Sequence, residues 1–201
     1  GLVAEYMDQH PQVTVDMILS DQCLDLVQEG VDIAFRIGQL EDSSLIGRYL
    51  GDVRGILCAS PDYIAAHGTP TNPEQLSDHQ LMTQTSWNNW TMQSPDDEPM
   101  TVQVKPRLQV NDFASLYTLA LSGAGIAPLP LLIASPAIRS GDLVPLLPDW
   151  PFEAAPIHAL YPSNRHLSAK VRSFIDFIIE SIRPTPPWEV ELADGPSAVA
   201  S

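Results

Sequence analysis

The run Gly123-Ala124-Gly125-Ile126-Ala127-Pro128-Leu129-Pro130 follows an apolar helical pattern over residues 112–121. The glycines end that helix and permit a tight turn into a short apolar strand. A phosphate-binding glycine loop has the opposite order, because it leaves a strand and opens a helix. A proline also stands where a third glycine would be. The run therefore disfavours a dinucleotide site and favours a helix–turn–strand unit of an α/β protein.

The hydrophobic periodicity along the rest of the chain alternates between helix and strand. Residues 13–19 alternate like a strand, residues 21–29 form a short helical pattern ended by Gly30, and residues 31–37 are strand-like again. This β-α-β order predicts parallel strands with a right-handed crossover. Helices are also predicted, with their sequence start signals, at residues 2–9, 61–67, 73 onward, 112–122, 129–139 and 168–182. Further strands are predicted within 45–57, at 81–87, 101–110 and 157–161.

Length and composition allow one large or two small hydrophobic cores, with 201 residues of which 44% are hydrophobic. No apolar run is long enough to cross a membrane, and no basic-then-apolar signal segment opens the sequence. The two cysteines, Cys23 and Cys58, imply no disulfide framework. These observations predict a cytoplasmic location.

The net charge of −15, with only 10 lysines and arginines, limits the classes of partner that the chain can bind. Phosphate contacts dominate nucleic-acid affinity and need clustered basic residues, so this chain is not expected to bind DNA by itself. The histidines lack the spacing of a metal site, and no serine stands in a Gly-x-Ser-x-Gly elbow. The sequence thus predicts no metal, no cofactor and no enzymatic activity.

Several ordered motifs resemble the effector-binding domain of LysR-type transcriptional regulators, over about residues 1–183. An Asn-Asp helix start followed by Gly-x-Gly-Ile-Ala-x-Leu-Pro is the first of these motifs. The others are Asp32-Ile33-Ala34-Phe35-Arg36-Ile37-Gly38, Leu57-Cys58-Ala59-Ser60-Pro61-Asp62-Tyr63 with His67-Gly68-Thr69-Pro70, and Leu160-Tyr161-Pro162-Ser163 with Phe174-Ile175-Asp176-Phe177. No single motif is decisive, but the ordered set is specific.

The resemblance implies an α/β fold similar to type II periplasmic binding proteins, with two lobes joined by a double-crossover hinge. Lobe one would be residues 1–57 plus 153–183, lobe two residues 58–152, and residues 184–201 a disordered tail. The family's lobe one begins with a central strand before the first helix, and this sequence starts at the helix. The resemblance therefore implies an incomplete lobe one, from a truncated product or an incomplete reading frame, or a gap filled by the tail or a neighbouring chain.

The cleft between the lobes is the expected ligand site. Arg36 ends an apolar strand, where an arginine can hold a carboxylate with two hydrogen bonds; an internal ion pair with an acidic neighbour is the alternative. Ser20 and Asn111 precede predicted helices, so each could cap its helix or contact the ligand. The expected ligand-binding set is completed by Gly38, Thr85, Ser86 and Gly125. Trp87 and Trp90 could line the ligand site, although core packing is the more frequent role of such residues.

By resemblance, the chain would be the ligand-sensing and oligomerisation half of a LysR-type regulator. A small metabolite, for which Arg36 suggests an anion, would shift the arrangement of DNA-binding heads that belong to a separate N-terminal domain. The domain would form an antiparallel homodimer through the helix at residues 2–9 and the strand at 13–19. The alternative is a solute-binding protein of a transporter, which shares the fold.

Overall fold

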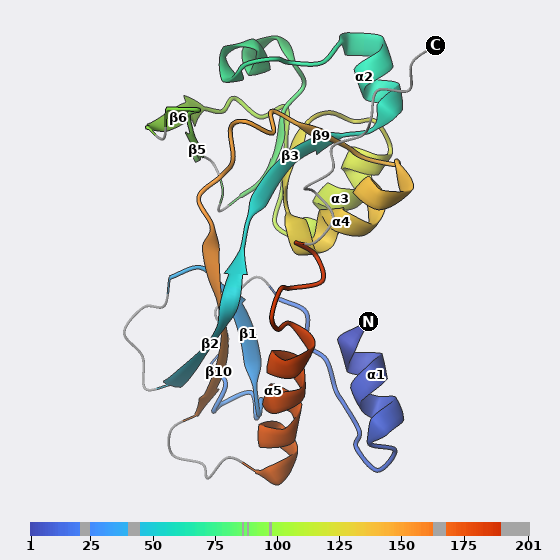
Figure 1. Ribbon diagram of the computed structural model, residues 1–201, viewed down its shortest axis with the longest axis vertical. Helices are drawn as coiled ribbons and strands as arrows, with labels where there is room; N and C mark the ends of the chain where they lie inside the picture. Colours follow the sequence, from blue (N-terminus) through green and yellow to red (C-terminus); the bar gives the residue numbers. More distant parts are fainter. Residues whose placement is uncertain are drawn as a thin grey trace. The chain divides into compact units, whose positions relative to one another are not determined.

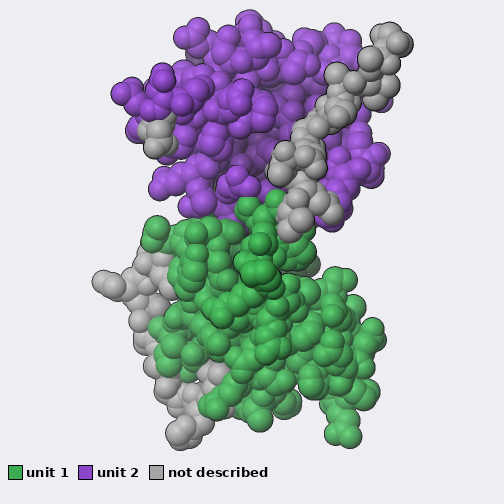
Figure 2. All heavy atoms as spheres, viewed as in Figure 1, with its two compact units in different colours: residues 1–52, 155–190 green, residues 53–154, 191–201 purple. Residues whose placement is uncertain are grey.

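The computed structural model describes residues 1–20, 25–39, 45–85, 87, 89–96, 98–162 and 168–189 (Figure 1). The described residues form two compact units, each with its own core (Figure 2). Unit 1 takes its residues from Gly1–Asp52 and Ala155–Val190, and unit 2 takes them from Val53–Ala154. The chain therefore passes between the units at residues 52–53 and again at 154–155.

Unit 1 is a three-stranded sheet with helices (Figure 1). Its strand order is β1-β10-β2, with bounds Ala34–Ile37, Ala155–Pro162 and Leu45–Val53. The helices are α1 (Leu2–Gln9) and α5 (Ala169–Ser181). The Ser168 hydroxyl accepts the N–H of Val171 at 3.3 Å, so Ser168 caps α5 as the sequence predicted.

The core of unit 1 joins its two helices to the sheet. The ring of Tyr6 on α1 lies 4.8 Å from Phe174 and 5.3 Å from Phe177 of α5, between ring centroids. Ala159 of β10 packs with Ile175 and Ile179 of α5 in a small buried cluster. Ile175 and Ile179 therefore lie on the face of α5 that covers the sheet.

The strand predicted at residues 13–19 is wrong. These residues carry no regular secondary structure, and Met17, Ile18 and Leu19 are 58%, 56% and 87% exposed. The predicted parallel pairing with residues 31–37 is also wrong, because β1 instead pairs antiparallel with β10, where Arg36 lies opposite His158. The physical reason is that alternating hydrophobicity gives a segment the side-chain pattern of a strand, whereas a stable strand also needs a neighbouring strand for its backbone hydrogen bonds.

The helix predicted at residues 21–29 is not present in its described part. Residues 21–24 lie outside the described ranges, and residues 26–30 form a hydrogen-bonded turn. The Asp25 carboxylate accepts the N–H groups of Val27 and Gln28 at 3.0 and 3.2 Å. Asp25 therefore caps this turn, because a carboxylate so close to free N–H groups satisfies them directly.

Unit 2 contains several small sheets and short helices (Figure 1). One sheet has the order β8-β3-β9, with bounds Ala127–Pro130, Gly55–Ala59 and Val144–Leu146. The strands β4 (Met82–Gln84) and β7 (Leu108–Val110) pair in parallel, and β5 (Asn89–Gln93) and β6 (Pro99–Gln103) form an antiparallel hairpin. The single strand predicted over 101–110 is therefore two strands with different partners.

Two of the helical segments of unit 2 begin at the residues that the sequence indicated. The segments are α2 (Pro61–His67), the 3₁₀ helix η1 (Pro73–Asp78), α3 (Phe113–Leu121) and α4 (Leu131–Ser140). The Ser60 hydroxyl accepts the N–H of Tyr63 at 3.2 Å, and the Asn72 side chain accepts that of Gln75 at 3.2 Å. The N–H of Thr71 donates to the side-chain oxygen of Gln75 at 2.7 Å. In a standard capping box this oxygen would accept the N–H of Asn72, one residue later in the chain.

The core of unit 2 surrounds β3. Leu57, Trp90 and Ile126 belong to one buried cluster, while Cys58, Met82 and Leu116 belong to a second one on the other face. The helix α3 ends before Gly123, and the chain turns into β8, as the glycine-rich run predicted. This turn fixes the start of β8 beside β4.

Candidate functional site

Thr85 and Asn111 directly follow the two parallel strands β4 and β7. The register pairs Gln84 with Val110, so both strands end at the same edge. The N–H of Thr85 donates to the carbonyl of Val110 at 2.8 Å, and Nε2 of Gln84 donates to the carbonyl of Asn111 at 3.3 Å. The structure therefore brings together Thr85 and Asn111 at the carboxyl edge of this sheet, the usual ligand edge of α/β folds.

Gln84 is a member of this edge that sequence reasoning missed. It is buried, although it is a polar residue, and its amide spans the two strands. A glutamine directly before Thr85, at the end of a predicted strand, was the available signal, since an amide side chain that becomes buried needs a partner.

Asp112, and not Asn111, caps α3. Its carboxylate accepts the N–H of Ser115 at 2.7 Å, and this bond, together with the Ser115 side chain, lowers the pKa of Asp112 from 3.8. The cap position predicted for Asn111 is thus displaced by one residue. The exposed Asn111 side chain is not needed at the helix end, while the neighbouring carboxylate adds negative charge to this edge.

Gly125 lies at the opposite end of β4. The N–H of Ile126 donates to the carbonyl of Gln80 at 2.8 Å, and the N–H of Met82 donates to that of Ile126 at 2.9 Å. A Cβ added at Gly125 would overlap the Gln80 carbonyl. Glycine is therefore required there by the close approach of two backbones, at the amino end of β4 and away from Thr85 and Asn111.

The remaining expected residues belong to unit 1, except Ser86, which lies outside the described residues. Arg36 is partly buried on β1, opposite His158. Gly38 follows the strand, and its N–H donates to the carbonyl of Pro156 at 2.8 Å. Ser20 is exposed in the irregular segment that precedes the first gap in the described residues.

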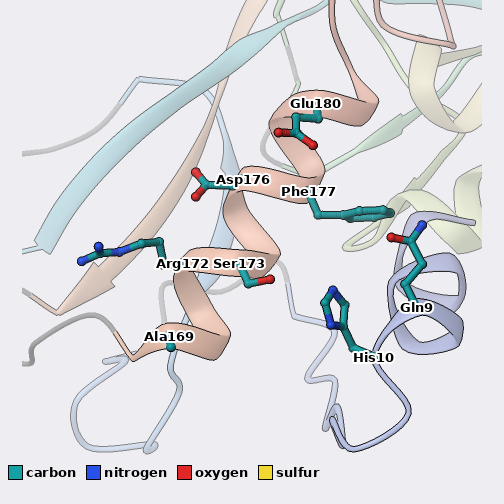
Figure 3. Close-up of a pocket in the computed structure, with 8 residues that line it drawn as sticks. All are labelled: Gln9, His10, Ala169, Arg172, Ser173, Asp176, Phe177 and Glu180. Carbon is teal, nitrogen blue, oxygen red and sulfur yellow. The ribbon is translucent and has the colours of Figure 1, made fainter.

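Unit 1 also has an open groove between the end of α1 and α5, with a volume of about 650 Å³ (Figure 3). Phe177 points toward the end of α1, where Gln9 and His10 lie. Arg172 and Asp176 point to another side of α5, where Asp176 binds Arg48 at 2.9 Å. The groove includes none of the residues expected from the sequence to bind ligand.

The part of the chain that the structure describes offers neither a cluster of metal ligands nor a membrane-spanning helix. Within it, the acidic, histidine and cysteine side chains form no group of three or more that could hold a metal ion. Its helices are all too short or too polar to cross a bilayer. Neither observation adds a residue to the candidate ligand site.

Known proteins share both the sequence and the structure of this chain. The model of the LysR substrate binding domain matches residues 1–183. The HTH-type transcriptional regulator CrgA of Neisseria meningitidis is 33% identical over 185 residues, covering 90% of this chain and 61% of CrgA. The HTH-type transcriptional regulator PtxR of Pseudomonas aeruginosa is 36% identical over 188 residues, covering 91% of this chain and 59% of PtxR. The chain thus spans about three fifths of these relatives.

Solved structures agree with these sequence relatives. The regulatory domain of CrgA has a TM-score of 0.81 and 33% identity, with 89% of each chain covered. Full-length AphB, the Vibrio cholerae virulence activator, has a TM-score of 0.76 and 32% identity over 89% of this chain and 62% of AphB. The expected fold class, α/β and similar to type II periplasmic binding proteins, is confirmed by these matches. The chain belongs to the family of LysR substrate binding domains.

Proposed function

We propose that this chain is the effector-sensing and oligomerisation domain of a LysR-type, DNA-binding transcriptional regulator acting in the cytoplasm, and that it is not an enzyme. The match of the family model to residues 1–183 carries this proposal. The transporter alternative is not favoured, because the relatives of this chain are transcriptional regulators. With a net charge of −15, the chain itself is a poor DNA ligand, so DNA contact would fall to a separate domain.

The proposed effector is a small molecule of the anionic class that an arginine selects, held by residues of both units. In unit 2, Thr85 and Asn111 would supply hydroxyl and amide groups, with Ser86 beside them. In unit 1, Arg36 would hold a carboxylate, with Ser20 and Gly38 as further ligand contacts. Gly125 would contribute indirectly, since its contact with Gln80 keeps β4 in register.

Effector binding would change the population of two arrangements of the regulator and so move its DNA-binding heads. The proposed homodimer places α1 and residues 13–19 of one copy against unit 2 of a second copy. The exposure of Met17, Ile18 and Leu19 supports this surface, because a run of large apolar side chains in water favours association. Sedimentation of the wild-type chain and of Leu19→Asp tests it: a dimer that becomes monomeric supports the interface, and a wild-type monomer contradicts it.

A thermal-shift screen of the 201-residue chain against small carboxylates and their neutral amides tests the effector proposal. A carboxylate that raises Tm should lose its effect in Arg36→Gln and weaken in Thr85→Val. Thr101→Val is the matched control, because it makes the same change at an exposed position of β6. Equal shifts in all variants would contradict the assignment of these residues.

A further inference from the structure

Trp87 has a fixed backbone two residues after Thr85. Its N–H donates to the carbonyl of Gln84 at 2.8 Å, and its carbonyl accepts the Thr83 hydroxyl at 2.6 Å and the Trp90 indole N–H at 3.2 Å. Thr83 and Trp90 are both fully buried. The position of Trp87 is therefore set by the core of unit 2, although its own side chain is only partly buried.

The indole of Trp87 packs against three separate segments of unit 2. Its centroid lies 4.9 Å from the ring of Phe152 and 6.1 Å from that of Phe113, in tilted and edge-on geometries. The far end of the indole also covers Gly55, so that a Cβ there would overlap its tip and lie 3.1 Å from Cδ2 of Phe152. The absence of a side chain at position 55 is what allows this packing.

These three segments have distinct places in the chain. Gly55 lies two residues after Val53, where the chain enters unit 2, and Phe152 lies two residues before Ala154, where it leaves. Phe113 begins α3 immediately after Asn111 and Asp112. One side chain thus contacts a residue close to each connection with unit 1, and also the helix that starts at the carboxyl edge of β4 and β7.

We infer that Trp87 couples the carboxyl edge of β4 and β7 to the two connections between the units. This inference rests on the proposed function, in which a ligand contacts Thr85 and Asn111. A ligand at that edge would move the backbone next to Trp87 or the start of α3. Because the indole is rigid and packed on three sides, its displacement would be passed to Gly55 and Phe152 together.

The distance distribution between the units, measured without ligand, tests this coupling. Spin labels at Glu5→Cys on α1 and Asp62→Cys on α2 report on units 1 and 2, in a background with Cys23→Ser; the buried Cys58 is retained. Trp87→Leu and Gly55→Ala should each shift or broaden the distribution beyond its wild-type width. Gly55→Ala should have little further effect in the Trp87→Leu background, because the smaller side chain leaves room for the added methyl group.

Two further variants separate coupling from simple loss of stability. Leu143→Ala shortens a buried side chain in the cluster that contains neither Trp87 nor Phe152, and should lower Tm while leaving the distribution unchanged. Trp87→Phe keeps a ring but removes the atoms over Gly55, and should change the distribution with a smaller loss of stability. Distributions for Trp87→Leu, Trp87→Phe and Gly55→Ala that superimpose on wild type would overturn the inference.

The two proposals fail in distinguishable ways, because the distance measurement uses no ligand. A screen without hits, or hits unaffected by Arg36→Gln and Thr85→Val, contradicts the effector proposal alone. Distributions that respond to Trp87 and Gly55 support the coupling in the same experiment. A ligand that shifts the wild-type distribution but has the same effect in Trp87→Leu would also overturn the inference.

Discussion

The hydroxyl of Tyr63 on α2 lies 3.2 Å from Nδ1 of His79, and the same hydroxyl accepts the N–H of Gln80 at 2.9 Å. The hydroxyl can donate its proton to Nδ1 of His79 when that nitrogen is unprotonated, as in one tautomer of the neutral ring. Burial lowers the pKa of His79 from 6.5, and the nearby His67 lowers it further, while Asp78 opposes the shift. Folding therefore favours neutral His79 beside Tyr63, whereas the bond from Gln80 to Tyr63 does not depend on the charge of His79.

This relationship predicts a loss of stability below about pH 6.5. A histidine whose pKa is lower in the folded state binds fewer protons there than in the unfolded chain, so stability rises with pH between the two pKa values. The contribution is complete above 6.5 and is lost as the pH falls from 6.5 through the lowered pKa. Urea unfolding measured at intervals from pH 5 to pH 8 should show this slope.

His79→Gln is the matched variant for the pH experiment, because a glutamine oxygen can accept the Tyr63 proton without titrating. Its stability should fall less than that of the wild type over the same pH interval. His67→Gln should reduce the slope only in part, since His67 is the second cause of the lowered pKa and its ring stacks on Tyr63 at 4.3 Å. Parallel pH profiles for wild type and His79→Gln would refute the assignment.

Gly125→Ala is predicted to be severely destabilising. The new Cβ would overlap the Gln80 carbonyl, and relieving that overlap strains the hydrogen bond from Ile126. We expect a loss of about 3 kcal/mol in the free energy of unfolding, as for other overpacked sites. Gly68→Ala is the control, because it has φ 83° but open space around its Cβ, and should cost only roughly 1–2 kcal/mol. Equal losses in the two variants would mean that the contact with Gln80 is not the constraint.

The ion pair between Arg48 and Asp176 is predicted to contribute little. Its atoms lie 2.9 Å apart, but the two side chains are 42% and 48% exposed. Exposed pairs of this kind are worth about 0–1 kcal/mol, because solvent screens the charges and ordering both side chains costs entropy. A double-mutant cycle with Arg48→Met and Asp176→Asn should give a coupling energy below about 1 kcal/mol, and lower still at high salt. A coupling energy of several kcal/mol, or one insensitive to salt, would contradict this view of the pair.

Local signals in the sequence predicted helix starts better than they predicted strand partners. Ser60, Asn72 and Ser168 cap their helices because a cap depends only on side chain and backbone a few residues apart. Residues 13–19 have the alternation of a strand but no ladder, since pairing depends on chain segments far away in the sequence. Asp176 illustrates the same limit: Arg172 lies four residues before it on α5, at the spacing of a helical ion pair, yet Asp176 binds Arg48 of β2.

The residues of the candidate site also divide into those that local signals predict and those whose position depends on tertiary contacts. Thr85 and Asn111 were predicted as site residues because the sequence shows where strands end and helices begin, whereas the parallel register that brings them together depends on tertiary structure. Gly125 was expected beside them, but the same register puts it at the other end of β4. Trp87 gave no local signal beyond its size, because its contacts with Gly55, Phe113 and Phe152 are all distant in sequence.

Cys58 is predicted to be chemically inert in the folded protein. It is fully buried in β3, its Sγ donates to the carbonyl of Ala127 at 3.6 Å, and burial raises its pKa to about 12. Because the thiolate is the reactive species, almost none is present near neutral pH. In a Cys23→Ser background, iodoacetamide at pH 8 should leave Cys58 unmodified in the native chain and label it fully after unfolding in urea. Native labelling at the rate of a free thiol would show that β3 opens readily, because the reagent can reach Sγ only when this central strand of unit 2 separates from β8 or β9.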